Sequence, residues 1–377
     1  MTMHDPVSLT ERLVSQDTVS ARPNAPLIAD LDELMRDIGA QTILQHKPGD
    51  DTQVNLLARL GPEDGEGGLL LAGHTDTVPW DDTMRATTVP ERDGRRMYGR
   101  GTCDMKGAIA AMICAAERLD VRRLRKPLWF GFTFQEEIGC IGAKQIAHGP
   151  IRLPVDHCII GEPTGLRPVT RHKGYAIGRG HLRGVPCHSS DPAQGVSAIH
   201  AGVRAVEALL GLAEEWKSRG VPAGGLTPPW TTLNVGLFDG GAARNMVPER
   251  ASFTVEVRPL PGLDPNDLFD EVEQVARAAA STVKGIHFEL ERVEADQPLF
   301  TADEEDLVKW LVEETGASPS TVPFYTEGAF FTSMGARTVI CGPGEIAQAH
   351  RVDEWVELDA LLHATDLYAA AIEEFCT

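Results

Sequence analysis

The sequence predicts an α/β fold in which a mainly parallel sheet carries an inserted α+β domain. The first observation is that short apolar runs alternate with helical segments, and that most of these runs end at acidic residues or histidines near glycine or proline. Such alternation is typical of an open, mainly parallel sheet, which binds ligands at the carboxyl ends of its strands. The second observation is that residues 175–290 follow the order β-α-β-β-α-β, which is typical of a ferredoxin-like unit.

The first part of the chain, residues 1–174, contains most of the parallel-sheet domain. Leu27, Leu31, Leu34 and Ile38 fall on one face of a helix, and Asp93-Gly94 is a hairpin signal. Residues 107–119 are small and apolar, so we expect a buried helix there. The expected elements are helices at 7–17, 27–38 and 107–119 and strands at 53–60, 68–73, 129–134 and 158–160.

The inserted domain is expected at 175–290, and residues 291–377 then complete the first domain. Asp264-Pro265 resembles an N-cap followed by proline in the first helical turn. The insertion has expected strands at 175–182, 231–238, 251–257 and 286–291 and helices at 196–216 and 264–283. The closing part has expected helices at 303–314 and 356–375 and a strand at 336–341. This order returns His350 to the first domain.

Composition excludes several classes of partner. The chain has 377 residues, which suits two domains, and a net charge of −20. That charge argues against nucleic acid and anionic membranes and permits a cationic small substrate. The seven cysteines include no CxxC pair, so we expect free thiols in a reducing compartment. No signal peptide or membrane-spanning run is recognisable, and we expect a cytoplasmic protein.

Six chemically reactive side chains are expected near strand ends or in the loops beside them. They are His74, Asp104, Glu136, Glu137, Glu162 and His350. Any one of the acids could be a solvated loop residue, but together they form a nitrogen-and-oxygen set that suits Zn²⁺ or a similar ion. Five ligands are too many for one catalytic zinc, whereas two ions that share one carboxylate need five: two ligands for each ion and the shared one. Of the adjacent Glu136 and Glu137, one can bind metal while the other acts as a general base.

Several motifs make the sequence recognisable. They are Gly67–Pro79 (Gly-Gly-Leu-Leu-Leu-Ala-Gly-His-Thr-Asp-Thr-Val-Pro), Asp104-Met105-Lys106-Gly107, Gly161-Glu162-Pro163-Thr164, His172-Lys173-Gly174, His188-Ser189-Ser190, Arg258-Pro259-Leu260-Pro261-Gly262 and Gln348-Ala349-His350. The chain resembles the cocatalytic zinc aminoacylase and carboxypeptidase family nearly from end to end. The resemblance implies a zinc-peptidase-like catalytic domain with an inserted dimerisation lid.

The resemblance also implies a role for each residue of the metal centre. His74, Asp104 and Glu162 would hold one Zn²⁺, and Asp104, Glu137 and His350 would hold the other, with Asp104 as the bridge. Co²⁺ can substitute in this family. Asp76 would orient His74, and Glu136 would be the general base. A cis peptide is expected between Asp104 and Met105.

The resemblance assigns further roles outside the metal ligands. His188 would reach the active site of a partner subunit in a homodimer formed through residues 175–290. Arg258 would bind a substrate carboxylate together with Asn245, and Glu327 would contact a substrate amine. Without the resemblance, His188 reads as a surface histidine, Arg258 as half of an ion pair, and Glu327 as a solvated acid.

The activity implied by the resemblance is hydrolysis of the acetyl amide of N²-acetyl-L-ornithine to L-ornithine and acetate, a step of arginine biosynthesis. Related N-acyl amino acids, such as N-acetylcitrulline or succinyl-diaminopimelate, remain alternatives, as does a dipeptide or carboxypeptidase substrate. A catalytically silent binding module is the alternative from another class. It is disfavoured because all five ligand positions and Glu136 are present.

Overall fold

The computed structural model describes residues 3–63, 65–219 and 224–377, and the chain divides into two compact units. Unit 1 comprises Met1–Thr170, Thr301–Ser320 and Thr326–Thr377, and unit 2 comprises Arg171–Phe300 and Thr321–Tyr325. The sequence-based boundary at 290 falls inside strand β12 (His287–Asp296). The strand continues beyond Glu291 through a register shift between Arg292 and Glu294, which interrupts the alternation that marks a strand in the sequence.

A mixed sheet forms the centre of unit 1, with the strand order β1-β2-β6-β3-β7-β15-β8. The four central strands, β6, β3, β7 and β15, are parallel neighbours. Strands β2 and β8 pair with them in antiparallel orientation, and β1 pairs antiparallel with β2. The mainly parallel sheet expected from the sequence is therefore found at the centre. The strands are β1 (Gln41–Lys47), β2 (Asp50–Leu60), β3 (Leu69–His74), β6 (Leu128–Thr133), β7 (His157–Pro163), β8 (Val169–His172) and β15 (Arg337–Gly342).

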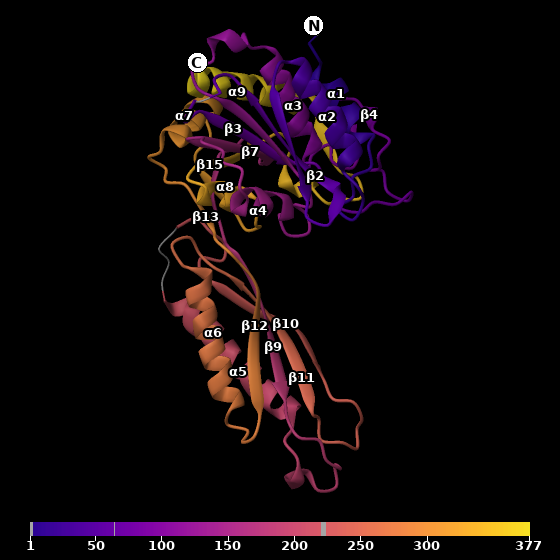
Figure 1. Ribbon diagram of the computed structural model, residues 1–377, viewed down its shortest axis with the longest axis vertical. Helices are drawn as coiled ribbons and strands as arrows, with labels where there is room; N and C mark the ends of the chain where they lie inside the picture. Colours follow the sequence, from indigo (N-terminus) through magenta and orange to yellow (C-terminus); the bar gives the residue numbers. More distant parts are fainter. Residues whose placement is uncertain (1–2, 64, 220–223) are drawn as a thin grey trace. The chain divides into compact units, whose positions relative to one another are not determined.

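Helices cover both faces of this sheet (Figure 1). Helices α1, α3 and α9 pack together on one face, and α4 and α8 lie on the other. The helix α3 is buried from Lys106 to Ala116 because its small side chains allow close packing, in agreement with the sequence. The helices are α1 (Pro6–Val14), α2 (Ala25–Asp37), α3 (Lys106–Glu117), α4 (Ile141–His148), α7 (Asp306–Thr315), α8 (Gly328–Ser333) and α9 (Leu358–Cys376).

A small second sheet in unit 1 joins two distant segments. Strands β4 (Glu91–Asp93) and β5 (Arg96–Tyr98) form the hairpin predicted from Asp93-Gly94, and β16 (Trp355–Glu357) pairs with β5. The loop after β5 carries Asp104, and the loop before β16 carries His350. The sheet therefore brings the two loops to one place.

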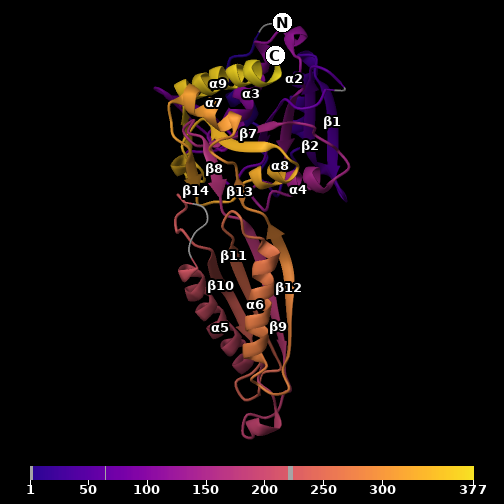
Figure 2. The same ribbon diagram turned by 90° about the vertical axis from the view of Figure 1, so that its left-hand side faces the viewer.

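Unit 2 is a four-stranded antiparallel sheet with two helices on one face (Figure 2). The order β10-β11-β9-β12 and the sequence of elements are those of a ferredoxin-like unit. Asp264 accepts a hydrogen bond from the backbone N–H of Asn266, so the predicted N-cap is confirmed. The elements are β9 (Tyr175–Arg183), α5 (Ala198–Ser218), β10 (Thr232–Gly240), β11 (Arg250–Arg258), α6 (Pro265–Ala280) and β12 (His287–Asp296).

Short elements complete the described chain. The strands β13 (Leu299–Phe300) and β14 (Ser320–Val322) lie where the chain passes between the units, and three short 3₁₀ helices occupy Val121–Arg123, Pro192–Gln194 and Ile346–Gln348. Among the described helices, none combines the length and the apolar character needed to cross a membrane.

Candidate metal centre

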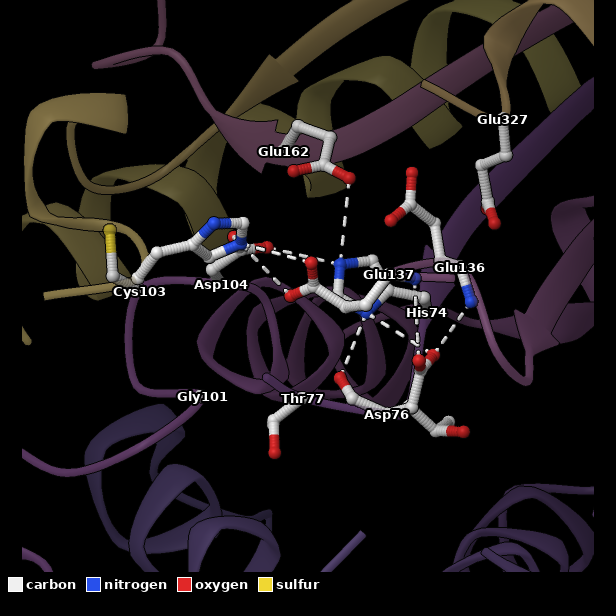
Figure 3. A network of polar contacts seen from close by, with 12 residues as sticks. His74, Asp76, Thr77, Gly101, Cys103, Asp104, Glu136, Glu137, Glu162 and Glu327 are labelled. Carbon is white, nitrogen blue, oxygen red and sulfur yellow. Dashed lines mark hydrogen bonds and ion pairs between the residues drawn. The ribbon is translucent and has the colours of Figure 1, made fainter. Parts of the chain in front are cut away.

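Five of the six predicted metal-centre residues follow or end the parallel strands, and Asp104 precedes helix α3. His74 is the last residue of β3, Glu162 lies at the end of β7, and Glu136 and Glu137 follow β6. His350 lies in the loop between β15 and β16. Because parallel strands end at the same edge of a sheet, residues from four regions of the sequence meet there (Figure 3).

His74 is fully buried, and its two ring nitrogens have different environments. Nδ1 lies 2.9 Å from the backbone carbonyl oxygen of Asp76, to which it can only donate. The proton is therefore on Nδ1, and Nε2 is left as a ligand atom. Nε2 faces Asp104 Oδ1 at 3.0 Å and Glu162 Oε1 at 3.5 Å.

The two oxygens of Asp104 face different histidines. Oδ1 lies 3.0 Å from His74 Nε2, and Oδ2 lies 3.3 Å from His350 Nε2. His350 Nε2 is also 2.9 Å from Glu137 Oε2. The expected cis peptide between Asp104 and Met105 is present. Asp104 thus lies between one group of His74 and Glu162 and a second group of Glu137 and His350.

Without a bound cation, the carboxylates and histidines of this centre do not neutralise one another. Burial and the negative charge of Asp104 raise the pKa of Glu162 well above its usual value, and they raise the pKa of Glu137 as well. Burial would lower the pKa of His74, but the carboxylates of Asp104 and Glu162 raise it well above its usual value. Burial would likewise raise the pKa of Asp104, but contacts with His350 and His74 lower it. A site in which carboxylates raise one another's pKa values is one that a bound cation stabilises.

The donor set fits metal ions on geometry as well as on charge. Two overlapping groups, His74 with Asp104 and Glu137 and His74 with Glu136 and Glu162, have ligand atoms within 4.8 Å of one another. Distance alone therefore does not separate Glu136 from Glu137. Glu137 differs from Glu136 in that its Oε2 lies 2.9 Å from His350 Nε2, which places Glu137 beside the second histidine.

The carboxylate of Asp76 contacts backbone groups more closely than the ring of His74. Its oxygens accept from the backbone N–H of Glu136 at 2.9 Å, from that of Glu137 at 3.4 Å and from Ser20 Oγ at 2.6 Å. Its nearer oxygen is 3.6 Å from His74 Nδ1, whereas its backbone carbonyl is at 2.9 Å. The Asp76 carboxylate thus lies beside the ring of His74 and also holds the turn that carries Glu136 and Glu137, and its role in orienting His74 stays a prediction.

Glu136 and Glu327 form a second acidic pair beside the candidate ligands (Figure 3). Burial raises the pKa of Glu136 to about 8, and the charges of Glu137 and Glu327 add to the effect. Burial also raises the pKa of Glu327 to about 7. Glu327 is 0% exposed, its Oε2 accepts from Thr133 Oγ1 at 2.6 Å, and its Oε1 has no partner among the described residues. It is not the solvated acid that a loop position suggests.

Sequence reasoning missed two buried charged residues next to the candidate ligands, Glu354 and Arg100. Both are buried, and they form an ion pair with Nη1 to Oε2 at 2.6 Å. The signal that could have revealed them is an acidic residue in the stretch after His350, where the sequence reads Arg-Val-Asp-Glu-Trp.

Two of the three predicted residues of unit 2, His188 and Asn245, lie close together, and the third, Arg258, ends strand β11. His188 and Asn245 are exposed on neighbouring loops, where Ser189 N–H donates to the Asn245 carbonyl at 3.0 Å. Arg258, at the end of β11, is half-buried; it donates to Glu256 at 2.8 Å and lies 4.3 Å over the ring of Tyr175. Arg258 thus forms an ion pair within unit 2, and its role toward a substrate stays a prediction.

The fold and this acidic centre define a hydrolase of a known family. Residues 70–374 match the family model described as peptidase family M20/M25/M40, and the chain belongs to that family. This result confirms the resemblance seen in the motifs. A more particular similarity is to the acetylornithine deacetylase of Myxococcus xanthus, which is 37% identical over 377 residues, covering 98% of this chain and 97% of the relative.

Solved structures show the same fold. The aminopeptidase PepT of Bacillus cereus superposes with a TM-score of 0.78 at 22% identity, covering 100% of this chain and 99% of PepT. The family M20 metallo-carboxypeptidase Sso-CP2 of Sulfolobus solfataricus superposes with a TM-score of 0.74 at 19% identity, covering 99% of each chain. These likenesses support the α/β architecture with its inserted unit.

Proposed function

We propose that the protein hydrolyses the acetyl amide of N²-acetyl-L-ornithine to L-ornithine and acetate. The observation that carries the proposal is the shared carboxylate of Asp104, with His74 3.0 Å from one oxygen and His350 3.3 Å from the other. The choice of substrate is supported by the 37% identity, over nearly the whole chain, to a protein named acetylornithine deacetylase.

In this proposal two Zn²⁺ ions, for which Co²⁺ can substitute, occupy the centre. His74, Asp104 and Glu162 would hold one ion, and Asp104, Glu137 and His350 would hold the other. When bound, such ions supply Lewis-acid chemistry that polarises an amide carbonyl and makes water acidic enough to lose a proton near neutral pH.

Glu136 is the general base of the proposed reaction. It takes a proton from the attacking water and returns it to the nitrogen of the leaving amine. In the metal-free protein, burial raises the pKa of Glu136 above its usual value. A carboxyl group with a raised pKa can both accept and release a proton near neutral pH. The Asp76 carboxylate, which holds the Glu136 N–H at 2.9 Å, keeps the base in place.

Glu327 offers a basis for choosing among acylated amino acids. Its buried Oε1 lacks a partner among the described residues, and a buried carboxylate favours a cationic group. We propose that it recognises the δ-ammonium of ornithine, a charge that citrulline lacks. Arg258, with Asn245, is the proposed partner of the substrate carboxylate.

We further propose a cytoplasmic homodimer formed through unit 2. The edge strand β10 exposes Leu237, and helix α5 exposes Val203 and Leu210, at 63%, 54% and 53%. His188 Nδ1 accepts from Ser190 N–H at 3.2 Å, which leaves Nε2–H as the donor to an oxyanion in the partner subunit's site. The seven free cysteines suit a reducing compartment.

The experiment that tests the function compares kcat/KM for N²-acetylornithine, N-acetylcitrulline, succinyl-diaminopimelate and a dipeptide with the zinc-loaded protein. We expect N²-acetylornithine to have the highest value. A dipeptide as the best substrate would assign the chain to a peptidase function instead. No turnover of any substrate by a protein that binds no metal would favour the binding-module alternative.

A further inference from the structure

One buried carboxylate outside the metal ligands holds the loop that carries Asp104. Glu354 is 0% exposed, and its Oε1 accepts three backbone N–H groups: those of Gly101 at 3.0 Å, Cys103 at 3.0 Å and Asp104 at 3.1 Å. Hydrogen bonds to an ionised carboxylate are stronger than those between neutral groups. The backbone of the loop is therefore fixed directly at Asp104, the residue that faces both histidines.

The other oxygen of Glu354 connects this loop to the segment of His350. Oε2 accepts from Arg100 Nη1 at 2.6 Å, and Arg100 Nη2 donates to the carbonyl of Arg351 at 2.9 Å. Arg351 directly follows His350 in the chain. Arg100 and Glu354 are both buried, so removing one charge leaves the other unpaired in a low-dielectric environment.

The contacts described above join the two side chains to backbone groups and to each other, and none of them involves a donor atom of the candidate ligands. Glu354 acts on the backbone of Asp104, and Arg100 acts on the backbone beside His350. A shift of either loop changes the separation between Asp104 Oδ2 and His350 Nε2, which is 3.3 Å here. Metal affinity is sensitive to such supporting contacts, whose loss typically weakens binding by about 10–100-fold.

We propose that Arg100 and Glu354 are positioning residues, which hold the Asp104 carboxylate and the His350 ring at the separation that two ions require. The inference rests on the proposed two-metal function, but it concerns metal affinity and does not depend on which amide is hydrolysed.

The test measures Zn²⁺ affinity of Glu354→Gln by competition with a chromophoric chelator. Glutamine keeps the size of the side chain and loses its charge. We expect the affinity for at least one ion to fall by about 10–100-fold. We also expect the visible absorption spectrum of the Co²⁺-substituted variant to change, which a stability defect alone would not produce.

A matched control is Glu357→Gln. Glu357 pairs with Arg96 at 3.0 Å and joins the same two segments through β16 and β5, but both side chains are partly exposed and neither contacts the Asp104 loop. This variant should keep the affinity and spectrum of the unchanged protein. Equal losses in the two variants would overturn the proposal, and so would an unchanged affinity in Glu354→Gln.

A second variant, Arg100→Lys, covers the case in which Glu354→Gln does not fold. Lysine keeps the charge but cannot span both Glu354 and the Arg351 carbonyl in the same way. We expect a loss of about tenfold in affinity for one ion, within the range for supporting contacts; unchanged affinity would overturn the proposal. If the protein without substitutions binds no ion, that result would instead contradict the proposed function.

Discussion

His350 lies with its Nε2 2.9 Å from Glu137 Oε2, although the two residues are 213 positions apart in the chain. Strand β16, which follows His350, pairs with β5 and brings this segment next to the loop of Asp104, whose carboxylate His350 also contacts. Glu137 is thus in direct contact with His350, whereas Glu136 belongs to the wider group of His74 and Glu162. The two adjacent glutamates are expected to respond differently to the same substitution.

The first prediction contrasts Glu136→Gln with Glu137→Gln. Glu136→Gln should retain both zinc ions and lower kcat by about 10²–10⁴-fold, because general-base catalysis is lost. Glu137→Gln should reduce the zinc content, because it removes a ligand beside His350. Zinc content by plasma mass spectrometry and steady-state kinetics check both variants. Loss of zinc in Glu136→Gln with full zinc in Glu137→Gln would reverse the assignment.

The second prediction concerns Asp76. Asp76→Asn should lower kcat/KM by about 10–100-fold while the zinc content is kept, because the amide no longer holds the turn of Glu136 and Glu137 correctly. His74 should keep its tautomer, since the Asp76 carbonyl at 2.9 Å is unchanged. Ser20→Ala, which removes a neutral donor from the same carboxylate, is the milder control. Complete loss of zinc in Asp76→Asn would show that the carboxylate orients His74 after all.

The sequence predicts those residues of this centre that lie at the ends of apolar strands. His74, Glu137 and Glu162 lie at or just after apolar strands, so their meeting at one sheet edge follows from the parallel topology. Glu354 is different: its role depends on three N–H groups more than two hundred positions away. Local periodicity carries no signal for such a contact.

The secondary structure was likewise predicted where an element has a clear apolar period and missed where it has none. The long periodic helices α5, α6 and α9 were predicted with small errors at their ends, because an apolar stripe over many turns identifies them. Strand β1 and helix α4 were missed. Strand β1 has no fully buried position, so its sequence shows no buried face. Helix α4 is too short for an apolar period to be distinctive.

The third prediction concerns pH and the metal-free protein. Burial raises the pKa of Glu136 from 4.5 to about 8, and contacts with Asp104 and Glu137 raise the pKa of His350 from 6.5 to about 10. A group whose pKa is raised on folding contributes stability below its unfolded value, and that stability is lost as the pH rises through the folded value.

The melting temperature of chelator-treated protein should therefore fall between about pH 5 and about pH 9. The zinc-loaded protein should show a smaller fall, because the bound cations replace the protons. Differential scanning fluorimetry across this range measures both slopes. A metal-free protein that becomes more stable as the pH rises would contradict the assigned directions.

The fourth prediction tests substrate choice through Glu327. Glu327→Gln should lower kcat/KM for N²-acetylornithine by about 30-fold or more, the effect of removing one partner from a buried charge pair of about 2 kcal/mol or more. It should change kcat/KM for N-acetylcitrulline much less, because citrulline has no charge to pair. Equal losses for the two substrates would assign Glu327 a structural role.

Sharing of Asp104 between two ions is tested most directly by anomalous X-ray diffraction at the zinc edge from crystals of the zinc-loaded protein. We predict two anomalous peaks about 3.5–4 Å apart, one beside each oxygen of Asp104, with His74 and His350 on opposite sides. Crystals of Asp104→Asn should lose or weaken both peaks. A single peak, or two peaks that Asp104 does not bridge, would contradict the account.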